Sequence, residues 1–362
     1  MTPSATLLSD QVFQLNTLLW ALEQVPGEAG PVDPVLRSAG YYLDSIGRRL
    51  IVPVSPNART ALRAVTGTDD LSPTNPDLWL RHASEDAVPL VELKSHGFSP
   101  DSSNSRQALK MIISAADVAS AVGRREATAG HVLYATAGTD SAGMSETLKT
   151  LEETVSEVGG SPAKTGVLSL IEVDAGVGLG SPVPDDLPSA MGAALSAPAV
   201  VLRREGEDDL QPLYFIPWIP GIEDSQDSAL HAEGLQQLTA RLLTQAIAAV
   251  GQSTVPGVVV LKPDELLVAA TFGVFSRWRD NDRDSLIRAA SNVLRVALKP
   301  TGVSQMVHGD VQIDLRDSDT QEAVLQRLEH ADPADPSKNL EAALNEQLTL
   351  FETAPPDAQA ER

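Results

Sequence analysis

The most regular hydrophobic pattern lies at the start of the chain, where apolar side chains recur every three or four residues from Leu8 to Leu22. This spacing predicts a helix over residues 5–25 that ends near Pro26 and Gly27. Similar patterns predict further helices at 35–47, 57–65, 106–122 and 145–158. Short apolar runs predict strands at 49–55, 131–137 and 165–174.

Two apolar-rich runs, 77–83 and 88–95, are separated by the four residues 84–87. A separation of this length is typical of a β-hairpin. Together with strands that alternate with helices, the hairpin predicts an α/β fold with a mixed sheet flanked by helices.

The second half of the chain has its own pattern after a stretch rich in Gly and Pro, residues 176–189, which is interpreted as a linker. The expected organisation is a first domain over 1–175, an α+β accessory or docking domain over 190–330, and an acidic, partly disordered segment over 331–362. The elements expected in the second domain are a hairpin near 199–217, helices at 231–250, 283–298 and 319–330, and strands at 257–261, 266–275 and 303–315.

Composition narrows the class of protein. The chain has 362 residues, 42% of them apolar, and no cysteine. Disulfides, cysteine-based zinc sites and thiol catalysis are therefore excluded. No apolar run approaches the ~18–20 residues of a membrane span, and the amino terminus lacks the basic start of a signal peptide. We expect no membrane contact and a cytoplasmic location.

The charge balance bears on possible partners. Lys and Arg number 27 against 49 Asp and Glu, which gives a net charge of −22. This charge opposes tight nucleic-acid binding by the chain alone, because phosphate neutralisation supplies most of that affinity. Part of the acid lies at 205–209, at 221–227 and in the carboxyl-terminal segment, outside the first domain.

The hairpin carries the candidate chemistry. Pairing around residues 84–87 is expected to set 79 opposite 92 and 77 opposite 94, so that Asp77, Glu92 and Lys94 share one face. Mg²⁺ takes oxygen ligands and is held by only one or two carboxylates plus water and phosphate. Asp77 and Glu92 could hold such a metal, with the backbone carbonyl of Leu93 as a further oxygen and Lys94 beside the water.

The spacing around Lys94 is selective within this chain. Of the seven lysines, only Lys94 has an acidic residue two positions before it. That acid-x-Lys unit lies fifteen to seventeen residues after the Pro76-Asp77 dipeptide.

With this pattern, residues 1–175 resemble the PD-(D/E)xK superfamily of restriction-endonuclease-like nucleases. The resemblance implies that Asp77 and Glu92 hold Mg²⁺ or Mn²⁺ and that Lys94 assists the attacking water. It also suggests Glu23 as a carboxylate from the first helix. Gln107 stands where some relatives carry a Gln, but Met111 replaces the Tyr that follows it there. Arg106 and Lys110 on the same helix are candidates for phosphate contact.

The expected function is hydrolysis of DNA phosphodiester bonds by a metal-dependent nuclease, as a subunit of a bacterial defence or DNA-repair complex. No phosphate-binding loop of an ATPase is present, so a protein partner is expected to supply ATPase activity or basic surface. Two alternatives stay open. Glu92 and Lys94 could be an ordinary solvated pair on a strand, or the fold could be a catalytically silent adaptor that docks a partner.

Other motifs favour structural roles. The six histidines show no metal-ligand spacing, although His96 follows Lys94 with the same strand parity. The Gly176, Gly178 and Gly180 repeat resembles a dinucleotide loop but leads into prolines, which favours a linker. Residues 277–279, Arg-Trp-Arg, fit a solvated strand end better than a nucleic-acid contact.

Overall fold

The computed structural model describes residues 5–23, 33–48, 54–69, 71, 74–122, 129–174, 176–203, 214–216 and 228–332. Contacts divide the chain into two compact units: unit 1 holds the described residues up to 203 and unit 2 holds those from 214 onward. Among the residues described, no helix is long and apolar enough to cross a membrane.

Unit 1 is built on one sheet whose seven strands lie side by side in chain order. The middle strands β3, β4 and β5 run parallel to one another, and every other neighbouring pair is antiparallel. The expected α/β fold with a mixed sheet is therefore confirmed. The strands are β1 (Tyr41–Ile46), β2 (Leu78–His82), β3 (Ala87–Leu93), β4 (Ala129–Ala137), β5 (Lys164–Val173), β6 (Gly176–Gly180) and β7 (Ala199–Arg203).

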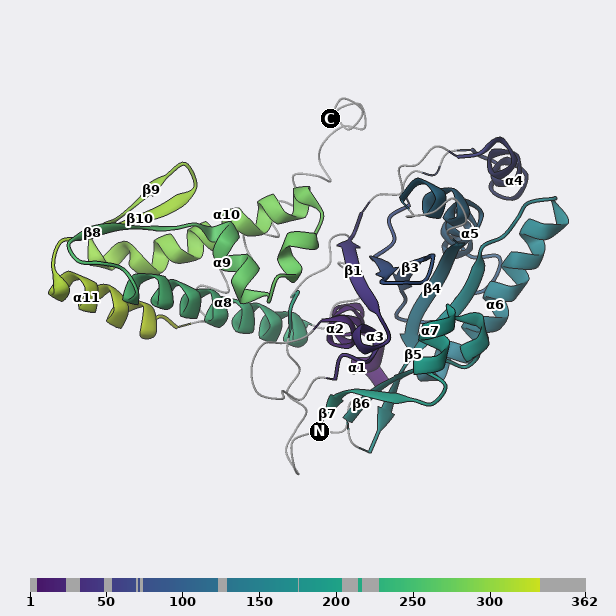
Figure 1. The fold of residues 1–362 in the computed structure, drawn as a ribbon, viewed down its shortest axis with the longest axis horizontal. Helices are drawn as coiled ribbons and strands as arrows, with labels where there is room; N and C mark the ends of the chain where they lie inside the picture. The colour runs from purple at the N-terminus through teal and green to yellow at the C-terminus, as the bar shows by residue number, and fades with distance from the viewer. Residues whose placement is uncertain are drawn as a thin grey trace. The chain divides into compact units, whose positions relative to one another are not determined.

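Helices α4 (Pro56–Thr66), α5 (Ser103–Val122) and α6 (Gly138–Glu157) cover one face of this sheet (Figure 1). Their apolar side chains form one buried cluster with residues of β2, β3, β4 and β5. The packing is close where β4 passes under α5, because a Cβ on Gly130 would lie only 2.1 Å from the carbonyl oxygen of Ala115.

Helix α2 (Gln11–Leu22) lies on the other face, after the short helix α1 (Ala5–Ser9). It contacts β3 in the middle of the sheet and both edge strands, β1 and β7, so the sheet curls around it. Every residue from Val12 to Leu22 is buried. The carboxylate of Asp10 begins the helix by accepting a 2.8 Å hydrogen bond from the Phe13 N–H, which is an N-cap.

The expected helix at 35–47 is wrong. The chain forms only the four-residue helix α3 (Val35–Ser38) and then strand β1. Gly40, with φ of +94°, reverses the chain between the two elements. Edge pairing with β2, including Tyr41 opposite His82, outweighs the weak helical pattern. Of the strand expected at 49–55, residues 49–53 lie outside the described residues, and Ser55 caps α4 through the Ala58 N–H at 3.3 Å.

The linker expected at 176–189 is also different in the structure. Residues Gly176–Gly180 form β6, which pairs antiparallel with β5, and β7 extends the same sheet. Val177 and Leu179 are fully buried, and the glycines that alternate with them lack side chains that would mark a strand in the sequence. Unit 1 therefore continues past residue 175 through η1 (Pro184–Asp186), α7 (Ser189–Ala194) and β7.

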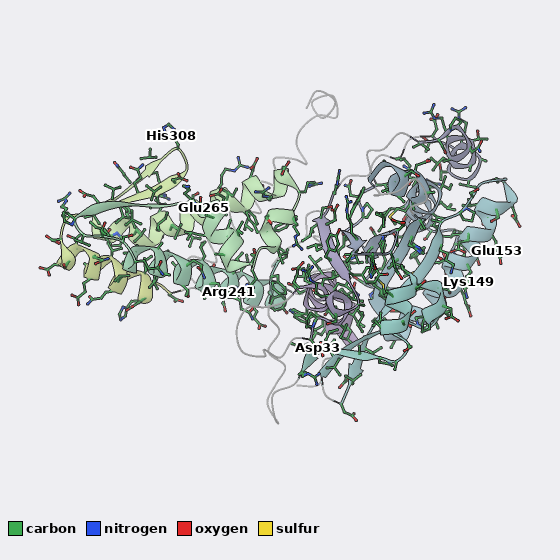
Figure 2. All side chains as sticks on the ribbon, in the orientation of Figure 1. Asp33, Lys149, Glu153, Arg241, Glu265 and His308 are labelled. Carbon is green, nitrogen blue, oxygen red and sulfur yellow. The ribbon has the colours of Figure 1, made fainter. Side chains whose placement is uncertain are left out.

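Unit 2 combines helices with a three-stranded antiparallel sheet in the order β8-β10-β9. The half-buried Arg241, labelled in Figure 2, donates a 2.8 Å hydrogen bond to the Ala270 carbonyl and another to the Tyr214 carbonyl. It thereby ties two segments to α8. The elements are α8 (Ser228–Gly251), β8 (Gly257–Leu261), α9 (Pro263–Ala270), η2 (Val274–Arg277), α10 (Asp280–Leu298), η3 (Lys299–Thr301), β9 (Ser304–Val307), β10 (Asp310–Leu315) and α11 (Ser318–Glu329).

Two expectations for this part of the chain need correction. The strand expected at 266–275 is helix α9 followed by η2, because Pro263, Asp264 and Glu265 favour a helix start. The strand expected at 303–315 is a hairpin whose turn, at His308 and Gly309, has positive φ at both residues (Figure 2). Most of the second strand expected near 199–217, and the segment 333–362, lie outside the described residues.

Candidate active site

The pairing of β2 with β3 brings the two candidate acids together. Leu78 lies opposite Val91 and Trp79 opposite Leu90, so Asp77, one residue before β2, faces Glu92 across the pair. The register expected from the sequence, 79 opposite 92 and 77 opposite 94, is wrong by two residues. Because the shift is even, it preserves the shared face.

The turn explains this register. The Nδ1 atom of His82 accepts hydrogen bonds from the backbone N–H groups of Ser84, at 3.1 Å, and Glu85, at 2.6 Å. On its other side, Nε2 lies 2.8 Å from the Ala39 carbonyl. The chain therefore reverses directly after residue 82, one position earlier than the sequence suggested.

Asp77 is half-buried at the amino end of β2. Its Oδ2 accepts a 2.7 Å hydrogen bond from the Leu93 N–H, and its backbone carbonyl accepts one from the Gly47 N–H at 2.8 Å. Backbone bonds on both sides thus hold Asp77 against the end of β3.

Glu92 lies in a strand that is buried on both faces and is itself only 5% exposed. Its Oε1 accepts hydrogen bonds from Lys94 Nζ at 3.0 Å and from Gln107 Nε2 at 2.9 Å. Its Oε2 is buried and makes no hydrogen bond. A buried carboxylate oxygen without a donor is costly unless another group, such as a cation or water, completes it.

The surroundings of the two acids disfavour their charged forms. Burial, followed by the neighbouring Glu92 carboxylate, raises the pKa of Asp77 well above its usual range. Burial also raises the pKa of Glu92, although Lys94 and Gln107 oppose that rise. With one lysine beside two carboxylates, the fully ionised cluster keeps one excess negative charge in a poorly solvated place.

Two glutamines from α2 reach the same strand end from the other face of the sheet. Gln11 Nε2 donates to the Leu93 carbonyl at 2.8 Å, and Gln14 Nε2 donates to the Lys94 carbonyl at 3.0 Å. The Leu93 carbonyl, expected as a metal ligand, therefore already has a donor. The Oε1 of Gln14 is buried without a hydrogen bond. Neutral amides carry no motif, so the sequence did not reveal them.

A row of buried hydroxyls continues the site across the sheet. Tyr134 pairs in register with Glu92, and Thr136 with Ser169 on the next strand. Alternation along the strands puts these side chains on the same face as Glu92 and Lys94. Their hydroxyl oxygens are buried and make no hydrogen bond. Burial raises the pKa of Tyr134, and the charges of Glu92 and Asp77 raise it further.

This row was missed because its members are separated by 42 or more residues from Glu92 in sequence, and only strand register brings them together. The one signal available in the sequence was a polar residue in the middle of an otherwise apolar run.

The supporting residues have different outcomes. Gln107 on α5, which the resemblance suggested as a supporting residue, donates a hydrogen bond to Glu92. Arg106 is exposed in the first turns of the same helix. Glu23 lies just beyond the carboxyl end of α2, nine residues after Gln14, which is about 14 Å along the helix axis from the site. The structure therefore does not bring Glu23 to Asp77 and Glu92. His96 lies at the rim, with Nδ1 3.9 Å from the Asp140 carboxylate.

The residues present fit a hard divalent cation. No group of three or more His, Cys, Asp or Glu side chains gathers as a metal-binding cluster in the described part of the chain. Mg²⁺, however, requires only one or two carboxylates when water and phosphate complete its shell. Asp77 supplies one carboxylate, and Glu92 supplies a buried oxygen that lacks a donor.

No family model, no curated protein and no solved structure matches the chain. The interpretation of the site therefore depends on its own geometry.

Proposed function

We propose that the chain is a metal-dependent nuclease of the PD-(D/E)xK type that hydrolyses phosphodiester bonds of DNA. The observation that carries the proposal is the convergence of Asp77, Glu92 and Lys94 at one strand end, with Lys94 Nζ 3.0 Å from Glu92 and both acids destabilised as anions by burial. The mixed sheet flanked by helices is consistent with a restriction-endonuclease-like fold.

Asp77 and Glu92 would hold Mg²⁺ or Mn²⁺, which polarises the phosphate and lowers the pKa of a bound water. The carboxylates of this site need a positive partner, because one lysine leaves them with excess negative charge. Leu93 N–H and Gln107 fix the orientation of the two carboxylates before any ligand arrives.

Lys94 would act on the attacking water. Its side chain is 14% exposed beside the more deeply buried Glu92, so it keeps some contact with solvent. In the reaction the water oxygen forms a bond to phosphorus, the bond from phosphorus to the leaving oxygen breaks, and that oxygen takes up a proton. As an ammonium, Lys94 can orient the water. As a neutral amine, it can accept the proton that the water loses.

The net charge of −22 supports a role within a larger assembly. A protein partner that contributes basic surface or ATPase activity would compensate for the acidic chain, as in a defence or repair complex. Unit 2, which carries no comparable pair of buried acids among its described residues, would serve docking or regulation.

A cleavage assay tests the proposal. The chain is incubated with single- and double-stranded DNA in Mg²⁺, Mn²⁺ or chelator, beside Asp77→Asn, Glu92→Gln and Lys94→Met. We expect cleavage that requires metal and falls at least about 100-fold in each variant, as loss of a metal ligand or proton-transfer group does. Cleavage that survives all three substitutions would exclude this site.

The same assay addresses the alternative of a silent adaptor. A matched control is Glu153→Gln on α6, an exposed carboxylate in the same unit (Figure 2). It removes one negative charge, as Glu92→Gln does, and should leave cleavage unchanged. Equal loss in the control and in Glu92→Gln would attribute the effect to overall charge rather than to the site.

A further inference from the structure

Three cations share one exposed face of α10 in unit 2. Arg288, Arg295 and Lys299 are exposed, and Lys299 directly follows the helix. At 100° per residue all three lie within about 40° of one another, with Arg288 between the other two in angle, and Asn292 lies beside them. The row is about 16 Å long along the helix axis. Asp284 lies on the same face one turn before Arg288.

Among the described residues, none of these three cations forms an ion pair with an acid, which distinguishes them from three other cations of unit 2. Arg295 donates only to the neutral amide of Asn292, through Nε at 3.2 Å and Nη2 at 2.6 Å. By contrast, three other cations of the unit each contact a carboxylate: Lys262 contacts Glu265 at 2.7 Å, Arg283 contacts Asp280 at 3.5 Å, and Arg316 contacts Asp314 at 3.1 Å.

A concavity adjoins the row. It has a volume of about 210 Å³ and is lined by Arg295, Lys299, Ser304, Gln305, Met306 and Val311. This volume is below the ~300–1,000 Å³ of most small-molecule pockets. It suits a small anionic group held by two cations and by the polar side chains of β9.

We infer that Arg288, Asn292, Arg295, Lys299, Ser304 and Gln305, the α10 basic surface, bind the sugar–phosphate backbone of a nucleic acid. Arg offers a planar fork of donors and Lys a point charge, and both suit phosphate. Asn, Ser and Gln are further phosphate hydrogen-bonding residues. A row of cations spaced along a helix can contact successive phosphates of one strand.

The composition of the surface favours a nucleic acid over an acidic peptide. Tight peptide docking requires buried apolar or aromatic anchors, and Met306, at 39% exposed, is the one large exposed apolar side chain lining the concavity. Cations in a last helical turn also stabilise the helix end, which accounts for Arg295 and Lys299 but not for Arg288, almost three turns earlier. The inference depends on this charge pattern and not on the proposed nuclease activity.

A binding measurement with the full chain tests the inference. Fluorescence anisotropy of a labelled 20-nucleotide DNA, single- or double-stranded, is recorded in chelator over a range of salt concentrations. The test variant combines Arg288→Gln, Arg295→Gln and Lys299→Gln. The control combines Lys262→Gln, Arg283→Gln and Arg316→Gln, which removes the same charge from cations that are already paired.

We expect the test variant to raise the Kd at least tenfold and to reduce the slope of log K against log salt by about 2–3, since each lost phosphate contact removes about 0.7–0.9. The control should change Kd less than threefold. Equal weakening in the two variants, or no binding by the parent chain, would overturn the inference. So would tighter binding of poly-glutamate than of DNA at equal ionic strength, which would indicate an acidic protein partner.

The result separates this inference from the proposed function. DNA binding that depends on the α10 basic surface, without cleavage in Mg²⁺ or Mn²⁺, would support the surface and count against the nuclease. Cleavage that depends on Asp77 and Glu92, with a KM that the α10 variant does not change, would support the nuclease and count against the α10 basic surface.

Discussion

At the scale of single residues, the site contains more negative than positive charge, and backbone hydrogen bonds hold Asp77 in place. Asp77 and Glu92 face each other from adjacent strand ends, and Lys94 is the cation paired with Glu92 among the described residues. Burial makes ionisation of the pair unfavourable in the metal-free protein. Such a buried pair lowers the stability of the metal-free protein, and a bound cation would offset this cost; both effects can be measured.

The first prediction concerns stability and pH. Because the pKa of Asp77 is raised in the folded state, the folded protein binds more protons than the unfolded chain above about pH 4. The contribution of Asp77 to stability is therefore most favourable at acid pH and is lost as the pH rises through its folded-state pKa. Asp77→Asn, which can keep the bond from the Leu93 N–H, should raise the melting temperature at pH 8 by several degrees and at pH 4 by none.

Thermal unfolding of the metal-free parent and variant at both pH values provides the measurement, since about 1 kcal/mol corresponds to 2–4 °C for a domain of this size. Glu153→Gln, on the exposed surface of α6, should show no such pH dependence. Destabilisation by Asp77→Asn of equal size at pH 4 and pH 8 would contradict the assigned direction of the shift.

The second prediction concerns Tyr134. Its hydroxyl is buried without a partner, while its ring packs on Phe98 with centroids 5.5 Å apart. Tyr134→Phe keeps the ring and removes an unsatisfied group, so stability should be unchanged or slightly higher. If the hydroxyl positions water near Glu92, cleavage should fall about 10- to 100-fold in kcat with little change in KM. Loss of stability with normal kcat would assign Tyr134 to packing alone.

The acid-x-Lys spacing after Pro76-Asp77 allowed Asp77, Glu92 and Lys94 to be predicted from the sequence, and Gln107 was suggested by the resemblance alone. The spacing is informative because strand alternation puts residues two apart on one face. Tyr134, Gln11 and Gln14 were not predicted, because no local pattern links them to Glu92. Glu23 was chosen as an available acid on the first helix, and its position just past the helix end removes it from the site.

At the scale of elements, the hairpin of β2 and β3 decides the geometry. His82 sets the turn by accepting two backbone hydrogen bonds, and the turn sets Asp77 opposite Glu92. Elements with strong periodicity, such as α5, β4 and β5, were predicted from the sequence. β1 and β6 were not, because edge pairing forms the first and glycines obscure the second.

The third prediction follows from this turn. His82→Ala removes the acceptor for two N–H groups and the contact with the Ala39 carbonyl, so the free energy of unfolding should fall by about 1–3 kcal/mol. Urea denaturation measures this loss. Ser84→Ala is the control, because its backbone N–H still donates to His82 Nδ1. Metal-dependent cleavage should fall as well, because the strand register positions Asp77. Stability of His82→Ala within 0.5 kcal/mol of the parent would show that pairing, rather than the turn, sets the register.

At the scale of the whole molecule, the chain consists of two compact units with separate sheets. The candidate site lies wholly in unit 1, and the α10 basic surface lies wholly in unit 2. The sequence indicated two units from the change in pattern near residue 180. It placed the boundary too early, because the glycines of β6 obscured that strand and the strand expected from residue 199, β7, pairs with β6 in unit 1.

The fourth prediction concerns the response of these units to metal. Mn²⁺ at 100 times its Kd should stabilise the unit that binds it by about 2.7 kcal/mol. Differential scanning calorimetry should therefore show one unfolding transition that rises with Mn²⁺ and another that does not. Glu92→Gln should abolish the rise. An equal shift of every transition, persisting in Glu92→Gln, would place metal binding elsewhere.

The central claim is that Asp77 and Glu92 together bind one divalent cation. Calorimetric titration of Mn²⁺ into the parent, Asp77→Asn and Glu92→Gln tests it most directly. The account predicts one saturable site in the parent, with affinity that increases with pH as the carboxylates ionise, and no measurable site in either variant. Binding of equal affinity in all three proteins, or no binding by the parent at pH 8, would contradict it.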